Sequence, residues 1–178
     1  LICIPLSFYY SFANVFLNDL GMEGAAGKMI YGQISEAIFI LAIPFLYYRL
    51  GVKNILIIGI AAWALRFFFF ANGDLEAYYW MIISGILLHG ICYDFFFVTG
   101  YMYTENKAGE KIKNAAQGLF TVATYGIGMT IGSWFSGIIT DSNTIEGIKN
   151  WGDIWMVPAY ISGAVLLFLV VFFKEKNK

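Results

Sequence analysis

Residues 30–48 read IYGQISEAIFILAIPFLYY, and residues 52–71 read VKNILIIGIAAWALRFFFFA. Each stretch has about the 20 mostly apolar residues that an α-helix needs to cross a bilayer. A turn at Leu50-Gly51 separates the two stretches. Four further stretches have the same length and character: residues 1–18, 78–103, 115–140 and 154–173. The sequence therefore predicts an all-α membrane protein with six transmembrane helices.

The composition agrees with a membrane protein. Of the 178 residues, 60% are hydrophobic and 13% are charged, whereas a soluble domain carries roughly 25% charged residues. The net charge of -1 provides no basic surface, so we expect no nucleic-acid partner. One His and two Cys indicate no metal site, and we expect no cofactor. No phosphate-binding loop or catalytic triad is evident, so an enzyme is not predicted.

The basic residues between the predicted helices fall mainly on one side of the membrane. That side includes the C-terminus and has eight of them: Arg49, Lys53, Lys107, Lys111, Lys113, Lys174, Lys176 and Lys178. The other side has two, Lys28 and Lys149. Because basic residues concentrate in cytoplasmic loops, we expect the C-terminus to be cytoplasmic. Residue 1 then lies on the cytoplasmic side too, directly inside an apolar stretch without Met or signal peptide. We therefore expect residues 1–178 to be a fragment that lacks its upstream part.

Four ionisable residues fall within the predicted spans, namely Glu36, Arg66, His89 and Asp94. Such groups are costly in a membrane and usually face a bundle interior or a water-filled path. For the two acids the alternative is a structural ion pair, and for His89 it is an interhelical hydrogen bond. Arg66 lies close to a helix end, where it would either extend toward the membrane surface or neutralise an acid.

Polar residues at helical spacing accompany these groups. Gln33 and Glu36 are three residues apart, and His89 and Tyr93 are four apart, so each pair shares a helix face. Similar stripes occur on the first and fifth spans: Ser7, Tyr10, Ser11, Asn14 and Asn18, and Gln117, Thr121 and Thr124. Stripes on four of the six helices predict a shared polar cavity, although Ser and Thr often bond only a neighbouring helix.

Seven short motifs in this order resemble the bacterial nucleoside:proton symporters of the major facilitator superfamily. They are FANVFL at 12–17, GQISE at 32–36, IPF at 43–45, RLGVKN at 49–54, AWALRF at 62–67, YDFF at 93–96 and AAQGLF at 115–120. Together they span nearly the whole chain. The resemblance is to the C-terminal six-helix half of a twelve-helix transporter, so residues 1–178 would be that bundle and the N-terminal half would be missing.

The resemblance implies a secondary active transporter of the bacterial inner membrane that imports nucleosides by proton symport through alternating access. The partners would be a nucleoside, protons, the lipid bilayer and the missing N-terminal half, in a monomer. The implied substrate-binding positions are Gln33, Glu36, His89, Tyr93, Asp94, Tyr10 and Ser7. Because burial favours the neutral form of a carboxyl group, Asp94 or Glu36 would carry the proton.

Some positions depart from the family pattern. Ser7 and Tyr10 stand where the family has amide side chains, His89 stands where a Tyr is expected, and Tyr93 where a Phe is. The base preference is therefore left open. Two alternative functions also remain: a superfamily carrier for another polar solute such as a sugar, and a non-transporting membrane interaction protein with a structural polar core.

Overall fold

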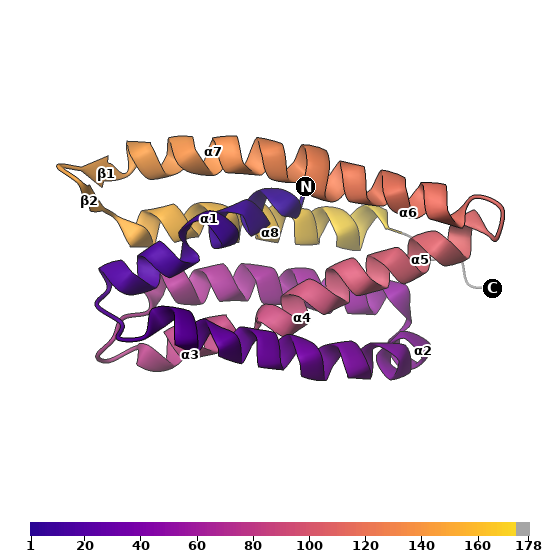
Figure 1. The fold of residues 1–178 in the computed structure, drawn as a ribbon, viewed down its shortest axis with the longest axis horizontal. Coiled ribbons are helices and arrows are strands. Elements are labelled where there is room, and N and C mark those ends of the chain that lie inside the picture. The colour runs from indigo at the N-terminus through magenta and orange to yellow at the C-terminus, as the bar shows by residue number, and fades with distance from the viewer. Residues whose placement is uncertain (174–178) are drawn as a thin grey trace.

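The computed structural model describes residues 1–173. The elements in chain order are α1 (Cys3–Asp19), α2 (Ala25–Asn72), α3 (Tyr79–Leu87), α4 (His89–Tyr93), η1 (Asp94–Val98), α5 (Thr99–Ala108), α6 (Lys113–Thr121), η2 (Val122–Gly128), α7 (Met129–Ser142), β1 (Thr144–Ile145), β2 (Ile148–Lys149) and α8 (Trp151–Phe172). Here η denotes a π-helical segment. The long helices run roughly along one axis (Figure 1). The mostly helical prediction is confirmed.

The longest element, α2, consists of two apolar helices joined at a glycine. All its residues are helical except Gly51, whose backbone angles are φ 75° and ψ 164°. Glycine has no Cβ and adopts positive φ at little steric cost, so the chain turns back at this residue (Figure 1). The turn expected at Leu50-Gly51 is confirmed. Residues 25–50 are called the first arm of α2 below, and residues 52–72 the second arm.

Length and hydropathy single out the stretches that could cross a membrane. Among the described residues three helical stretches qualify: Ala25–Asn72, Lys113–Ser142 and Trp151–Phe172. A fourth qualifies if the pair Tyr79–Leu87 and His89–Ala108, bent by 41°, counts as one span. The multi-pass character follows from these stretches. The count of six spans stays a prediction.

A short hairpin was missed by the all-α prediction. Strands β1 and β2 pair antiparallel, with Thr144 opposite Lys149 and Ile145 opposite Ile148. The two residues between them, Glu146 and Gly147, have φ of 51° and 81°, the backbone that a tight hairpin turn requires. Two-residue strands are too short to produce a detectable alternation of apolar and polar residues.

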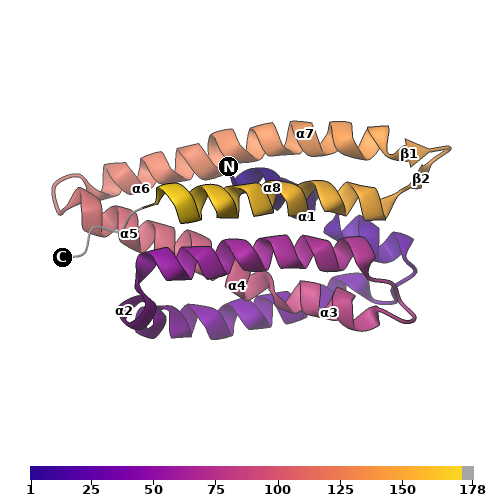
Figure 2. The same ribbon diagram turned by 180° about the vertical axis from the view of Figure 1, so that it is seen from behind.

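The core lies between α1, the second arm of α2 and α8. The ring of Trp155 on α8 is centred 5.4 Å from Phe16 and 5.3 Å from Phe70. It also stacks on Phe67, with ring centres 5.8 Å apart. Figure 2 shows α8 beside the second arm of α2 along most of its length. This aromatic packing holds the arm that carries Arg66 in a fixed position.

Candidate functional site

A polar cavity of about 250 Å³ lies where α1, the first arm of α2 and α4 meet. Its lining side chains are Tyr9, Tyr10, Asn14, Met29, Gln33 and His89. Three of these, Tyr10, Gln33 and His89, are among the residues predicted to bind substrate. The structure therefore brings polar stripes of three predicted spans to one place. We refer to this space as the polar cavity.

Two glycines allow α4 to approach α2 closely at the cavity. A Cβ on Gly90 would lie 2.5 Å from the carbonyl carbon of Ser35 and 2.6 Å from the amide nitrogen of Glu36. A Cβ on Gly32 would lie 3.0 Å from the Cβ of His89. No larger residue fits between these backbones without moving them apart. The close approach sets the position of His89 relative to α2.

Glu36 is next to the polar cavity and contacts His89. Its Oε2 atom lies 3.4 Å from Nε2 of His89. The His89 side chain is 9% exposed, whereas that of Glu36 is 33% exposed. The carboxylate of Glu36 can therefore meet a polar solute on one side while it contacts the imidazole on the other.

Arg66 does not extend toward the membrane surface. It is fully buried, and its guanidinium carbon lies 3.5 Å from the centre of the Tyr9 ring. One terminal nitrogen, Nη1, is 3.0 Å from Nδ1 of His89. Within residues 1–173 no ion pair joins Arg66 directly to a carboxylate. Both expectations for this residue are corrected, because the aromatic rings of α1 and α2 and the imidazole enclose its side chain.

Asp94 is the first residue of η1 and is not among the side chains that line the polar cavity. It is fully buried, and in the described part of the chain neither carboxylate oxygen has a hydrogen-bond partner. It lies four residues after Gly90, whose backbone packs closely against that of Ser35 and Glu36. A buried, unpartnered carboxyl group is unusual because isolated buried charges are costly. This makes Asp94 stand out among the acids of the chain.

Tyr93 contacts Tyr125, which was not among the residues predicted to bind substrate. Its hydroxyl is hydrogen-bonded to the hydroxyl of Tyr125. Its ring stacks on His89 at 5.8 Å between ring centres. Tyr125 lies four residues after Thr121, so it falls on the polar face predicted for the fifth span, and that spacing was the available signal. Tyr93 directly precedes the π-helical segment η1, and Tyr125 lies within the π-helical segment η2. Such segments are rare and often occur at functional sites.

Ser7 lies away from the polar cavity. It is fully buried, and its hydroxyl donates to the carbonyl oxygen of Cys3 at 2.9 Å. The same hydroxyl is 3.3 Å from the carbonyl oxygen of Met129 at the start of α7. A Cβ on Gly132 would clash with it. Its contacts are those of a helix-packing residue between α1 and α7.

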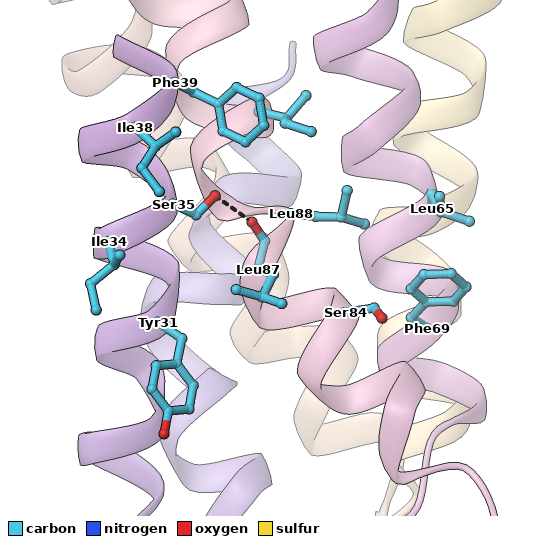
Figure 3. Close-up of a pocket in the computed structure, with 11 residues that line it drawn as sticks. Tyr31, Ile34, Ser35, Ile38, Phe39, Leu65, Phe69, Ser84, Leu87 and Leu88 are labelled. Atoms are coloured by element: carbon cyan, nitrogen blue, oxygen red, sulfur yellow. Dashed lines mark hydrogen bonds between the residues drawn. The ribbon is translucent and has the colours of Figure 1, made fainter. Parts of the chain in front are cut away.

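A second cavity, of about 560 Å³, is apolar and lies between the two arms of α2 and helices α3 and α4. Figure 3 shows Ile34 and Ile38 of the first arm, Leu65 and Phe69 of the second, and Leu87 between them. The hydroxyl of Ser35 is used within the protein, because it donates to the carbonyl oxygen of Leu87 at 2.6 Å. This cavity offers a polar solute few hydrogen bonds. Within residues 1–173, no group of three or more His, Cys, Asp or Glu side chains could hold a metal ion.

Comparison with known proteins agrees with these features. The chain is 37% identical over 185 residues to YegT of Escherichia coli (strain K12), whose name describes it as a candidate nucleoside transporter. It is 33% identical to the nucleoside permease NupG and 36% identical to the xanthosine permease of the same organism. These proteins are transporters by name, not enzymes. The alignments cover 99%, 96% and 91% of this chain but only 44%, 42% and 41% of the relatives, so the chain spans less than half their length.

Solved structures give the same result. A crystal structure of an aspartate-to-alanine mutant of the nucleoside transporter NupG matches with a TM-score of 0.90 and 30% identity, over 97% of this chain and 46% of that one. The structure of NupG without that mutation matches with a TM-score of 0.87 and 31% identity, over 98% of this chain and 47% of that one. The model of the nucleoside H+ symporter family matches residues 1–178. The chain belongs to the nucleoside H+ symporter family.

Proposed function

We propose that residues 1–178 are the C-terminal six-helix half of a transporter that imports nucleosides together with protons across the bacterial inner membrane. Family membership over residues 1–178 supports the substrate class and the coupling ion. The coverage of 46% of the NupG mutant chain at a TM-score of 0.90 supports the assignment of a half. The N-terminal half would then contribute the rest of the substrate site, and the whole transporter would act as a monomer.

The count of six helices rests on the break in α2. Its two arms are separate spans if Gly51 lies at the membrane surface. With α1, the bent stretch α3–α5, the stretch α6–α7 and α8, they make six. The 17 residues of α1 are about the minimum for crossing the hydrocarbon core. The break at Gly51, the turn between α5 and α6 and the end of α8 lie at the same end of the molecule (Figure 1).

The basic residues near that end support its assignment to the cytoplasm. Arg49 and Lys53 flank the Gly51 turn, and Lys107, Lys111 and Lys113 flank or occupy the turn between α5 and α6. Basic residues close to the ends of spans favour the cytoplasmic side. We therefore place the C-terminus in the cytoplasm and the β1–β2 hairpin outside the cell.

In this proposal the polar cavity holds one side of the nucleoside. Gln33 donates and accepts hydrogen bonds through its amide, and the Glu36 carboxylate accepts from ribose hydroxyls or base N–H groups. Tyr10, which is 52% exposed, offers a ring face and a hydroxyl to the base. The cavity is slightly smaller than a typical pocket for a small organic ligand. That size agrees with a site completed by a second bundle.

Glu36 and Asp94 are the proposed proton carriers. Glu36 is partly exposed and contacts His89 of the cavity wall, and Asp94 is buried without a hydrogen-bond partner within residues 1–173. A proton bound at this pair removes the cost of a buried negative charge. The loaded protein can then close around substrate and proton and open to the other side. The observation that carries the proposal is the convergence of Tyr10, Gln33 and His89 on one cavity, with Glu36 in contact with His89.

The test uses the full-length protein in vesicles and labelled uridine and adenosine. We expect Asp94→Asn to abolish accumulation against a gradient while exchange of nucleoside across the membrane continues. The matched control is Asp141→Asn, which alters an exposed acid of α7 and should leave accumulation unchanged. Unimpaired accumulation by the Asp94→Asn variant would contradict the coupling role. A panel of competing nucleosides and sugars identifies the substrate, and inhibition by sugars alone would contradict the substrate class.

A further inference from the structure

Arg66 lies behind the polar cavity and has no direct path to a solute. It is fully buried among the rings of Tyr9, Trp63 and Phe70, whose centres lie 3.5, 5.7 and 5.6 Å from its guanidinium carbon. Two of its nitrogens, Nε and Nη2, have no hydrogen-bond partner within residues 1–173. The third, Nη1, is directed at His89. A buried arginine in a membrane span is costly, and ionisable residues at such positions often have a functional role.

In the hydrogen bond between Arg66 and His89, only Arg66 can be the donor. A guanidinium group donates hydrogen bonds, accepts none and stays charged in proteins. At a separation of 3.0 Å, Nδ1 of His89 must therefore accept the hydrogen bond from Nη1. A neutral imidazole that accepts at one nitrogen carries its proton on the other. The proton of His89 is thus on Nε2, the atom that lies 3.4 Å from Oε2 of Glu36.

We propose that Arg66 is a positioning residue that fixes the Nε2-protonated tautomer of His89 and, through it, the orientation of the Glu36 carboxylate. His89 then keeps an N–H group 3.4 Å from the Glu36 carboxylate. It takes no second proton, because its Nδ1 faces a cation. Proton transfer in the site is thereby restricted to the two acids. The effect on transport rests on the proposed function, whereas the tautomer does not.

A purely structural arginine would have different consequences. The stacking of Arg66 on Tyr9 would stabilise the bundle through a cation–π contact, whichever His89 nitrogen carried the proton. The position of the proton in His89 therefore separates the two roles. Nitrogen-15 NMR of labelled histidine reports the two tautomers and the doubly protonated ring as distinct pairs of signals. In the full-length protein, the signals absent from a His89→Gln variant are those of His89.

We expect wild-type His89 to show the neutral Nε2-protonated form. In Arg66→Met, which keeps an apolar side chain of similar length, we expect a mixture of tautomers. The KM for nucleoside should rise about tenfold with kcat little changed, because a charge-assisted hydrogen bond in the chain that orients Glu36 is lost. Arg49→Met is the matched control, since Arg49 is exposed near the end of the first arm of α2. It should leave both the tautomer and KM unchanged.

Two results would overturn the proposal. One is a wild-type His89 that is protonated on Nδ1 or on both nitrogens, a measurement that needs no variant to fold. The other is an Arg66→Met protein that folds and keeps the single Nε2-protonated form. Absence of nucleoside uptake by a wild-type protein with the expected tautomer would instead contradict the proposed function and leave the role of Arg66 standing.

Discussion

Gly90→Ala is the substitution whose effect can be worked out most directly from the structure. The added methyl group would lie 2.5 Å from the carbonyl carbon of Ser35 and 2.6 Å from the amide nitrogen of Glu36, where ordinary contact begins at 3.4 Å. The obstacle is backbone, which cannot rotate aside. The backbones of α4 and α2 must therefore separate locally by about 0.9 Å. His89, the neighbour of Gly90, would move away from Glu36 by a similar amount.

This displacement has two measurable consequences. Overpacking of this kind costs about 1–3 kcal/mol of folding free energy, so the purified full-length protein should melt several degrees lower. The contact between Nε2 of His89 and Oε2 of Glu36 is already 3.4 Å long, and it would be lost. Loss of this polar contact leaves the Glu36 carboxylate less well oriented, and we expect nucleoside binding to weaken by about tenfold. The KM for nucleoside should rise by that factor.

The assay is initial-rate uptake of labelled nucleoside, with thermal unfolding measured on the same preparations. Gly163→Ala is the matched control, because an added Cβ at Gly163 in α8 has nothing within 4 Å. In a helix, alanine in place of glycine is stabilising by about 0.5–1 kcal/mol, so this variant should melt no lower than the wild type. If Gly90→Ala matches the control in both melting and KM, the close packing of α4 on α2 does not position the site.

Three further outcomes are expected from the contacts described. Tyr125→Phe removes the hydroxyl that is hydrogen-bonded to Tyr93, so the KM for nucleoside should rise several-fold while the melting temperature changes little. An unchanged KM would show that the tyrosine pair does not position the site. Ser7→Ala should leave KM unchanged and lower the stability by about 0.5–1.5 kcal/mol, because its hydroxyl bonds Cys3 of its own helix and Met129 of α7 and lies away from the polar cavity. A raised KM would restore Ser7 to the substrate site. Lys149→Ala breaks a partly exposed ion pair with Asp19, in which nitrogen and oxygen are 3.1 Å apart. The free energy of unfolding should fall by no more than about 1 kcal/mol, and high salt should remove the difference from the wild type. A large decrease in stability that persists in high salt would contradict this expectation.

The arrangement of helices could be read largely from the lengths of the apolar stretches. The turn at Leu50-Gly51 was expected because two stretches of spanning length adjoin there, and Gly51 has the positive φ that only glycine adopts readily. The meeting of Gln33 and His89 followed from polar stripes, because polar residues in a membrane bundle face one another. The seven motifs indicated the family, and the match of the family model over residues 1–178 confirms it.

Other features depend on contacts between distant segments, which a single sequence does not encode visibly. Arg66 was expected either to extend toward the surface or to neutralise an acid, but the rings of Tyr9 and Trp63 enclose it. Ser7 shares a stripe with Tyr10, yet α7 covers Ser7 and leaves Tyr10 open. The π-helical turns at Asp94–Val98 and Val122–Gly128 have no sequence signature comparable to a proline kink.

The most direct test of proton-coupled nucleoside transport is an uptake measurement with the full-length protein in vesicles. Uptake of labelled uridine and adenosine is measured with and without an inward proton gradient. We expect accumulation above the external concentration only with the gradient, and its loss when excess unlabelled nucleoside is added. Equal uptake with and without the gradient would contradict proton coupling. No uptake under either condition, by protein shown to be folded, would contradict nucleoside transport itself.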